Sequence, residues 1–395
     1  MGRLPEHIRF RLAAALLLLP GAGAAQASAH PALKELAARA AADSNSPEAH
    51  YALAMGYWRE KQWDSASKEL TTAITIEPSY AEAWLSRSYV YFERGTKYLK
   101  HDIEKGGAAG FKAAVHDWHH AFLLEPMVDL SAIGPAEIGE APRLSGETGS
   151  LIKDYHPWWM EPLTGGIAAM QQGRYQDARK LLQGVIDDPR IGMLSSTPDL
   201  VVFYHGLASA HSGDFRAAID DFTALRTRID NKVRFWRGPP VGVSSNELTY
   251  LIATSAWRGG FVTEAIDGYH QAVHVDFSLY MAHTQLAEIF AAGGGWDQAI
   301  LEAHSALDVN PDDPTLLLNL GRIFLKADRP LDAEDAFDQA ARLNPRNALA
   351  PYLLGQTLEK QNKMEEAKEA YRRFIAIAPS SYATQCAELR TRLSL

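Results

Sequence analysis

Three prolines near the C-terminus constrain the fold more than any other feature of this chain. Pro311, Pro345 and Pro379 lie 34 residues apart, and small and bulky apolar residues precede each of them at the same offsets. In the middle copy these residues include Ala333 and Phe337, which precede the proline by 12 and 8 residues. A period of this length indicates a repeated helix–turn–helix unit, which can bury its apolar face only by stacking on neighbouring copies. The sequence therefore predicts an all-α stack of helical hairpins.

The same copies share a second pattern, a leucine followed by a small residue. The pairs are Leu286-Ala287, Leu320-Gly321 and Leu354-Gly355. A small side chain at a fixed place allows two helices to pack closely. Together with the later alanine, the bulky residue and the closing proline, this pattern resembles the tetratricopeptide repeat family. The resemblance implies an α-solenoid, a right-handed superhelix of about eight hairpins, which binds its ligands on the concave face.

The period also predicts the organisation of the chain. The predicted segments are a signal peptide at 1–27, a leading helix and two repeats at 30–126, an irregular insertion at 127–158, the third and fourth repeats at 159–230, a loop insertion at 231–245, four further repeats at 246–379 and a capping helix at 380–395. The second repeat is longer than the others, with extra residues at Gly95–Gly110. Stacked repeats need a terminal helix to cover their exposed end, which explains the predicted cap.

The first residues have the layout of a secretory signal peptide. Arg3, Arg9 and Arg11 form a basic start, Leu12–Leu19 is apolar, and small residues follow at Ala25–Ala29. This order is typical of an exported protein, with a cleavage point after one of two small-residue motifs. We therefore expect a periplasmic or secreted protein. After removal of the signal we expect no integral membrane span, because no other apolar segment is long enough.

Net charge excludes several classes of partner. The formal charge is −9, and removal of residues 1–27 takes away three Arg and one Glu, which leaves about −11. Nucleic-acid binding depends on clustered Lys and Arg, and so does docking on anionic lipid. We therefore expect neither. The single cysteine, Cys386, rules out an internal disulfide framework.

The family's geometry implies that inner positions of the first helix in each repeat line a groove. The residues assigned to ligand binding there are Tyr51, Trp58, Tyr89, Phe203, Tyr250, Trp257, Arg258, Asn319, Arg322, Lys326 and Tyr352. Flat aromatic rings suit extended peptides, proline-rich segments or sugars, although the same rings could instead pack between helices. Asn319, Arg322 and Lys326 share one helix face and would suit an acidic peptide terminus, although an ordinary solvated face has the same pattern.

Two histidine groups raise the question of metal chemistry. His116, His119 and His120 lie beside Asp117, and a second group shows the same spacing of four residues (His270 and His274). Such spacing can contribute two ligands to a metal, but no HExxH motif and no cysteine pair accompanies it. The triple glycine at 293–295 falls where a repeat turns between its helices, so we interpret it as a turn. We therefore expect no catalytic residue, no metal and no cofactor.

These features favour a non-catalytic scaffold or adaptor of the periplasm or cell envelope. Its expected ligand is a protein or peptide segment held in the concave groove, and it could belong to an envelope complex. Two alternatives stay open. One is a carbohydrate-binding scaffold in polysaccharide export, and the other is a metal-dependent enzyme that uses the histidine groups.

Overall fold

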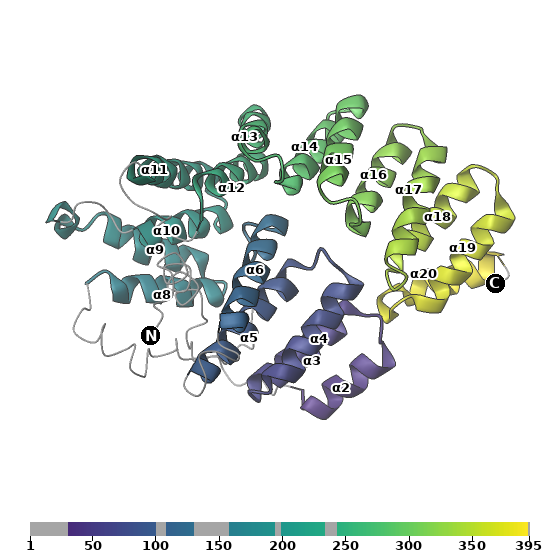
Figure 1. The fold of residues 1–395 in the computed structure, drawn as a ribbon, viewed down its shortest axis with the longest axis horizontal. Coiled ribbons are helices and arrows are strands. Elements are labelled where there is room, and N and C mark those ends of the chain that lie inside the picture. The colour runs from purple at the N-terminus through teal and green to yellow at the C-terminus, as the bar shows by residue number, and fades with distance from the viewer. Residues whose placement is uncertain (1–30, 100–107, 130–157, 194–198, 234–242, 394–395) are drawn as a thin grey trace. The chain divides into compact units, whose positions relative to one another are not determined.

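The computed structural model describes residues 31–99, 108–129, 158–193, 199–233 and 243–393. Within these ranges the chain consists of helices joined by short turns, with no strand (Figure 1). The first helices of the hairpins are α3 (Pro47–Arg59), α5 (Ala81–Leu99), α8 (Met160–Gln171), α10 (Asp199–His211), α12 (Ser245–Arg258), α14 (Tyr280–Ala292), α16 (Pro314–Lys326) and α18 (Leu349–Lys360). The second helices are α4 (Trp63–Ile76), α6 (Ala108–Leu124), α9 (Tyr175–Ile186), α11 (Phe215–Val233), α13 (Val262–Val275), α15 (Trp296–Val309), α17 (Pro330–Leu343) and α19 (Met364–Ile377).

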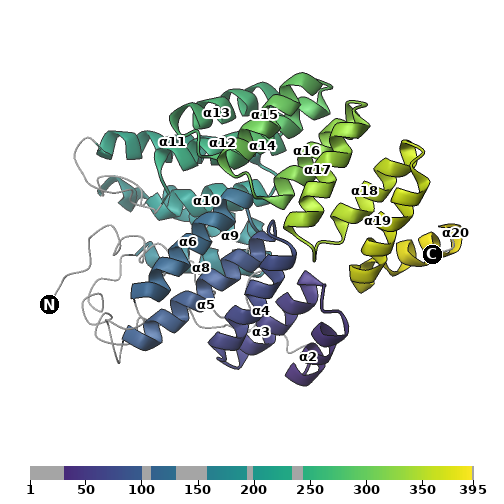
Figure 2. The ribbon, with the colours of Figure 1, turned by 45° about the vertical axis from the view of Figure 1, so that its right-hand side comes forward.

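The expected all-α solenoid is confirmed in the described ranges. A leading helix α2 (Leu33–Ala42) precedes the hairpins, and a terminal helix α20 (Ala383–Leu393) follows them. Short 3-10 turns lie at Pro189–Met193 and Ser380–Tyr382. Figure 2 shows α14 to α19 as stacked hairpins, in which each second helix packs against the first helix of the next repeat.

Glycines let the two helices of a hairpin approach closely, as the period predicts. A Cβ atom added to Gly321 would lie 2.5 Å from the ring of Phe337, and one added to Gly206 would lie 2.6 Å from the ring of Phe222. Both distances are far inside van der Waals contact, so no larger residue fits without moving the helices. The rings that fill these sites are fully buried.

The turn inside each hairpin requires a left-handed residue. Gly260, Gly294, Asp328 and Asn362 recur every 34 residues and have φ values of 79°, 78°, 57° and 59°. Glycine adopts this conformation without strain, and Asp and Asn tolerate it better than other residues do. The triple glycine at 293–295 therefore forms a turn, as expected.

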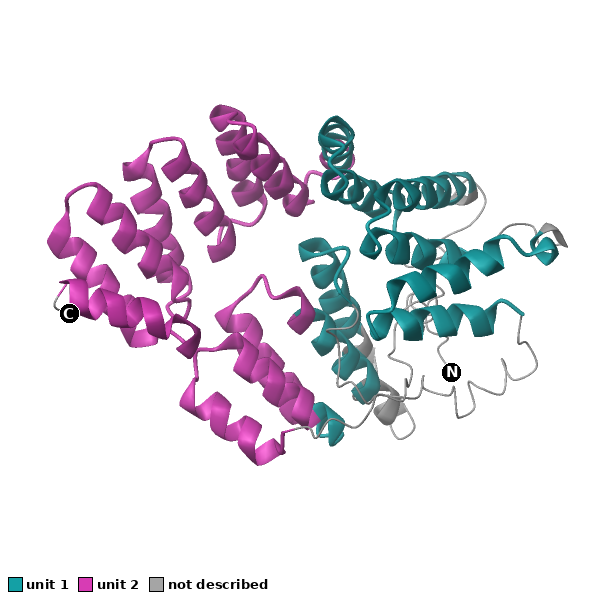
Figure 3. Ribbon diagram, turned by 180° about the vertical axis from the view of Figure 1, so that it is seen from behind, with its two compact units in different colours: residues 1–30, 58–63, 84–272 teal, residues 31–57, 64–83, 273–395 magenta. Residues whose placement is uncertain are grey.

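The helices form two compact units, which Figure 3 shows in different colours. The described residues within 58–63 and 84–272 form unit 1, and those within 31–57, 64–83 and 273–393 form unit 2. Each unit therefore combines an N-terminal stretch of chain with later repeats. The repeat period predicted a serial array and gave no sign of this division.

In unit 2, polar side chains from the loop between α17 and α18 join the last repeats to the first. The buried Asn344 side chain donates hydrogen bonds to the backbone carbonyls of Thr75 and Ile76, at 3.1 and 3.0 Å. Arg346 Nε donates to Asn45 Oδ1 at 3.0 Å. The two bonds from Asn344 satisfy carbonyls at the C-terminal end of α4, which the helix itself leaves without partners.

Several predicted segments lie wholly or partly outside the described residues. The signal peptide at 1–27 is outside them, as are residues 100–107 of the extended second repeat. The same holds for residues 130–157 of the first insertion and 234–242 of the second. Among the described residues, no helix is both long and apolar enough to span a bilayer.

Candidate functional site

The structure divides the eleven predicted groove residues between the two units. Unit 1 contains Trp58, Tyr89, Phe203, Tyr250, Trp257 and Arg258, and unit 2 contains Tyr51, Asn319, Arg322, Lys326 and Tyr352. The two sets occupy different environments.

Four of the unit 1 rings lie inside the helical packing. Trp58, Tyr89, Phe203 and Tyr250 are only 2%, 3%, 6% and 0% exposed. Trp58 donates its indole N–H to Glu93 at 3.1 Å and packs against Tyr89, with ring centroids 6.2 Å apart. Burial of a large aromatic ring removes much apolar area from water, which stabilises the fold. In this structure these four rings do not line an open groove, which corrects the open placement that the family's geometry implied.

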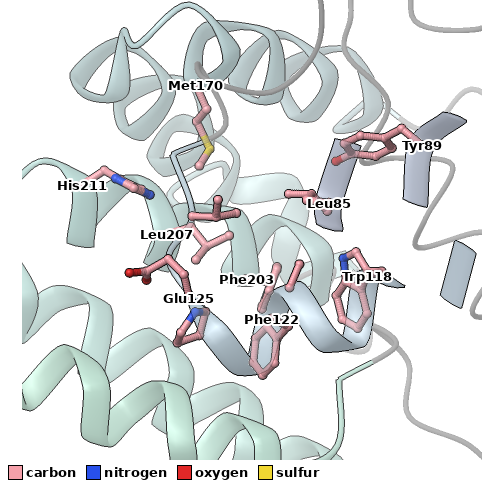
Figure 4. A pocket seen from close by; sticks show the side chains of 12 residues that line it. Leu85, Tyr89, Trp118, Phe122, Glu125, Met170, Phe203, Leu207 and His211 are labelled. Atoms are coloured by element: carbon pink, nitrogen blue, oxygen red, sulfur yellow. The ribbon is translucent and has the colours of Figure 1, made fainter. Parts of the chain in front are cut away.

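The covering element is α6 together with the chain that follows it. Tyr89 and Phe203 line one small cavity with side chains from α6 and α10, and Met170 of α8 closes another side (Figure 4). The cavity measures about 40 Å³, enough for very few water molecules and far too small for a peptide. The inner face of α10 is therefore already occupied by the chain itself.

Residues Leu123–Asp129, here called the exit segment, leave the end of α6 and lie against the same face. The Tyr250 hydroxyl donates a hydrogen bond to the carbonyl of Leu123 at 3.0 Å. Arg258 forms an ion pair with Glu125, and the Tyr175 hydroxyl donates to Asp129. The exit segment thus makes main-chain and side-chain contacts of the kind that a bound peptide would make.

His211 closes one side of this arrangement. Its ring stacks on Tyr175, with centroids 4.4 Å apart. Burial lowers the pKa of His211; Asp129 raises it, and Arg258 lowers it further. The imidazole is therefore held mainly neutral near pH 7.

Glu247 joins α12 to α6. In the capping box of α12, Ser244 Oγ accepts a hydrogen bond from the Glu247 backbone N–H, and the Glu247 carboxylate accepts one from the Ser244 backbone N–H. The same carboxylate forms an ion pair with His119, with 2.9 Å between Nε2 and Oε1. Burial raises the pKa of Glu247, but the hydrogen bonds from His119 and Ser244 outweigh burial and lower it overall.

The predicted groove residues of unit 2 have a different environment. Arg322 and Lys326 on α16 are exposed, and neither forms an ion pair with any side chain that the structure describes. Glu288 on α14 also reaches solvent, yet the surrounding protein desolvates its carboxylate and raises its pKa, an effect that Arg322 and Lys326 partly offset. Asn319 is half-buried on the same helix. The structure therefore brings Asn319, Arg322 and Lys326 together, as predicted, on one accessible face.

Tyrosines extend this surface. Tyr352 is half-buried, with its ring centroid 4.9 Å from that of Phe374, which in turn contacts Tyr382 at 5.4 Å. Burial and Glu77 raise the pKa of the Tyr382 hydroxyl, and Arg322 lowers it. Tyr382 therefore lies within electrostatic range of Arg322. Tyr51, the remaining predicted residue of unit 2, packs on Tyr80 with 5.2 Å between ring centroids.

His116 and His120 of α6 both lie near the ring of Trp84, with 6.3 Å between the two imidazole centroids, whereas His119 has a different partner. Asp117 is buried against Arg87 at 2.7 Å, and His120 packs on Trp84 with centroids 4.1 Å apart. His116 is 70% exposed, while His119 is paired with Glu247. His270 and His274 are both exposed on α13. In the part of the chain that the structure describes, no three His, Cys, Asp or Glu side chains are grouped to hold a metal ion.

Sequence reasoning missed the residues that hold the exit segment in place. Tyr175 is a repeat position, equivalent to Phe215 in the next repeat, but it has no assigned binding role. No motif marks Glu125, Asp129 or His211. One signal was present in the sequence: the residues from Val201 to Ala210 are apolar around most of α10, and the structure buries every one of them. A helix that is apolar on all sides is covered on all sides, which indicates a further element on its inner face.

Comparisons with known proteins agree with the repeat pattern. A sequence model of the family described as "Tetratricopeptide repeat" matches residues 163–233, 284–330 and 318–382. The chain is 31% identical over 125 residues to Photosystem I assembly protein Ycf3 of Synechococcus sp. (strain WH7803), covering 27% of this chain and 72% of that protein. It is 38% identical over 68 residues to the peroxisomal targeting signal receptor of Saccharomyces cerevisiae, covering 17% of this chain and 11% of the receptor.

Two solved structures are also similar. The C-terminal part of a TPR repeat-containing protein from Cytophaga hutchinsonii is 13% identical, with a TM-score of 0.45, over 58% of this chain and 82% of that chain. MamA 41-end from Desulfovibrio magneticus RS-1 is 12% identical, with a TM-score of 0.39, over 47% of this chain and 97% of that chain.

Proposed function

The chain belongs to the tetratricopeptide repeat family, whose members generally mediate protein–protein interactions, and we propose that it is a non-catalytic scaffold that binds a protein segment on the inner face of unit 2. The observation that carries this proposal is the exposed pair Arg322 and Lys326. Cations on the inner face of a repeat stack are available to a carboxylate-bearing partner. The named relatives include an assembly protein and a targeting-signal receptor, which fits a role in holding other proteins.

The proposed ligand is an acidic segment of a protein. Arg322 and Lys326 would bind its carboxylates, and Asn319 would donate a hydrogen bond to its backbone or its terminus. The ring of Tyr352 would supply apolar contact area at a small cost in side-chain entropy.

A charge-reversal experiment tests this assignment. The chain lacking residues 1–27 is used to capture partners from a cell-envelope fraction, and recovery is compared with that of the double variant Arg322→Glu and Lys326→Glu. The matched control is Arg372→Glu with Arg373→Glu on α19, where both arginines are exposed and lie 3.6 Å from the carboxylate of Glu369. We expect the inner-face variant to lose its main partner and the control to retain it. Equal recovery by the two variants would contradict a ligand site on α16.

We further propose that the protein acts outside the cytoplasm, in the periplasm or the cell envelope. The support is the basic, apolar and small-residue order of residues 1–27. N-terminal sequencing of the protein purified from its native cells checks this, with an expected start among residues 28–30. A mature chain that begins at Met1 would overturn cleavage.

A further inference from the structure

We propose that the inner face of α10 and α12 is a second peptide-binding surface, that the exit segment occupies it, and that an acidic, apolar segment of a partner protein displaces the exit segment. This second surface rests on the proposed function only because both treat the chain as a scaffold. It lies in unit 1 and involves residues other than those of the unit 2 site. The exit segment is the intramolecular copy of the ligand, so its contacts define what the surface recognises.

One backbone carbonyl of the exit segment accepts a hydrogen bond from the surface that the segment covers. Its helical part ends at Leu124, and Tyr250, a buried residue of α12, donates its hydroxyl hydrogen to the Leu123 carbonyl at 3.0 Å. The ring of Tyr250 also meets Phe122 edge-on, at 6.4 Å between centroids. Met127 of the exit segment is 3% exposed, and Phe122, which directly precedes the segment in α6, is 6% exposed, so apolar side chains anchor the segment and the last turn of α6.

Two carboxylates complete the recognition pattern. Glu125 is paired with Arg258 near the end of α12, and Asp129 accepts a hydrogen bond from the hydroxyl of Tyr175 at the start of α9. The surface thus offers an apolar centre between two donors to carboxylates. A partner with an apolar stretch followed by two acidic residues, spaced as in Leu-Leu-Glu-Pro-Met-Val-Asp, matches these donors.

The ionic contact can exchange with an outside ligand. The side chains of Arg258 and Glu125 are 37% and 31% exposed, so the pair is hydrated and an isolated pair of this kind contributes little to stability. An intramolecular segment also competes at a high effective concentration, so the surface binds outside ligands weakly until the segment is loosened.

The test measures binding of a labelled peptide to the full chain. The probe is a fluorescein-labelled peptide of residues 121–129, titrated with wild-type protein and variants while fluorescence polarisation is followed. Glu125→Gln weakens the exit segment and leaves the surface intact, so we expect it to bind the peptide about fivefold more tightly than wild type. The double variant Phe122→Ala with Glu125→Gln should bind more tightly still, by about fiftyfold.

Two controls separate displacement from general loosening. Arg258→Gln also frees the exit segment but removes the cation that binds the peptide carboxylate, so it should bind the peptide more weakly than Glu125→Gln does. Glu264→Gln breaks the exposed ion pair with Arg216, another ion pair of unit 1, and should bind like wild type. Circular dichroism confirms that each variant is folded.

Two outcomes would overturn the proposal. One is equal peptide affinity for wild type, Glu125→Gln and the double variant. The other is peptide binding that is lost on Arg322→Glu with Lys326→Glu but unaffected by Arg258→Gln, which would assign the peptide to unit 2 and leave the proposed function standing. Failure of the unit 2 site alone would appear in the partner-capture experiment and leave the peptide titration unchanged.

Discussion

Equivalent positions on the inner helices differ between the two units. The position directly after the small residue at the helix crossing is Ile167 in α8, Leu207 in α10 and Thr254 in α12, and all three are buried. In α14, α16 and α18 of unit 2 the same position holds Glu288, Arg322 and Gln356, none of which is buried. The N-terminal repeats depart from this contrast, because Met55 in α3 of unit 2 is buried and Arg87 in α5 of unit 1 is not. The same position of the repeat is therefore buried in some repeats and exposed in others, depending on whether another element of the same compact unit covers the helix. In unit 1 the cover is α6 and the exit segment.

The largest expected effect tests whether the two units are separately stable. Phe337 in unit 2 and Phe222 in unit 1 fill the same place in their hairpins and are both fully buried. Truncation to Ala at either site should lower the free energy of unfolding by about 3–5 kcal/mol. The reason is that it leaves a cavity beside a glycine, which has no side chain to fill the space. In hydrogen exchange, Phe337→Ala should expose α16 and α17 while α10 and α11 stay protected, and Phe222→Ala should do the reverse. Uniform loss of protection from either change would show that the units unfold as one.

Next in size is an exchange of residue types at the position that distinguishes the units. Leu207→Arg places an unpaired charge beneath α6 and should cost about 3 kcal/mol in the free energy of unfolding. Arg322→Leu, at the equivalent exposed position, should change it by about 0.5 kcal/mol or less. Denaturant titration measures both effects. A small cost for Leu207→Arg would mean that the cover on α10 separates easily.

The sequence predicts contacts inside one hairpin better than it predicts which helix faces another element covers. The close approaches of Gly206 and Gly321 to their aromatic partners are local to one hairpin, so the period alone predicts them. The exposure of Phe203 or Tyr250 depends on an element more than 70 residues away in sequence, which periodicity does not report. Arg322 is exposed on α16 because, among the residues that the structure describes, no part of unit 2 covers it, and its role in ligand binding stays a prediction.

Mild acid should loosen unit 1 through His120. Burial, with the nearby charge of His116, lowers its pKa from 6.5 to about 4. As the pH falls below 6.5, His120 of the unfolded chain becomes protonated while His120 of the folded chain stays neutral. The free energy of unfolding is therefore highest above pH 6.5 and falls as the pH drops towards 4. We expect a loss of about 2 kcal/mol across this range, less than the full shift implies because the ring is partly hydrated. Glu288 in unit 2 has a raised pKa, so acidification acts on it with the opposite sign.

His120→Gln isolates this effect. The variant keeps a polar side chain of similar size but does not titrate, so its melting temperature should fall less than that of wild type between pH 6.5 and 4. Parallel curves for the two proteins would show that His120 is not the group responsible. Hydrogen exchange corrected for intrinsic rates would then indicate which helices respond to acid.

The smallest expected effect has opposite signs at two glycines of the same unit. Gly206 and Gly184 both lie within helices, where Ala normally stabilises by reducing the freedom of the unfolded chain. A Cβ at Gly184 meets nothing within 4 Å, so Gly184→Ala should raise the free energy of unfolding by about 0.5–1 kcal/mol. A Cβ at Gly206 meets the Phe222 ring at 2.6 Å, so Gly206→Ala should lower it by about 1 kcal/mol despite the same backbone gain. Because the two changes are chemically identical, opposite shifts in the denaturation midpoint can come only from the helix crossing. Stabilisation by both would mean that the α10–α11 crossing relaxes freely, and the cover on α10 would then have to supply the rigidity that the crossing lacks.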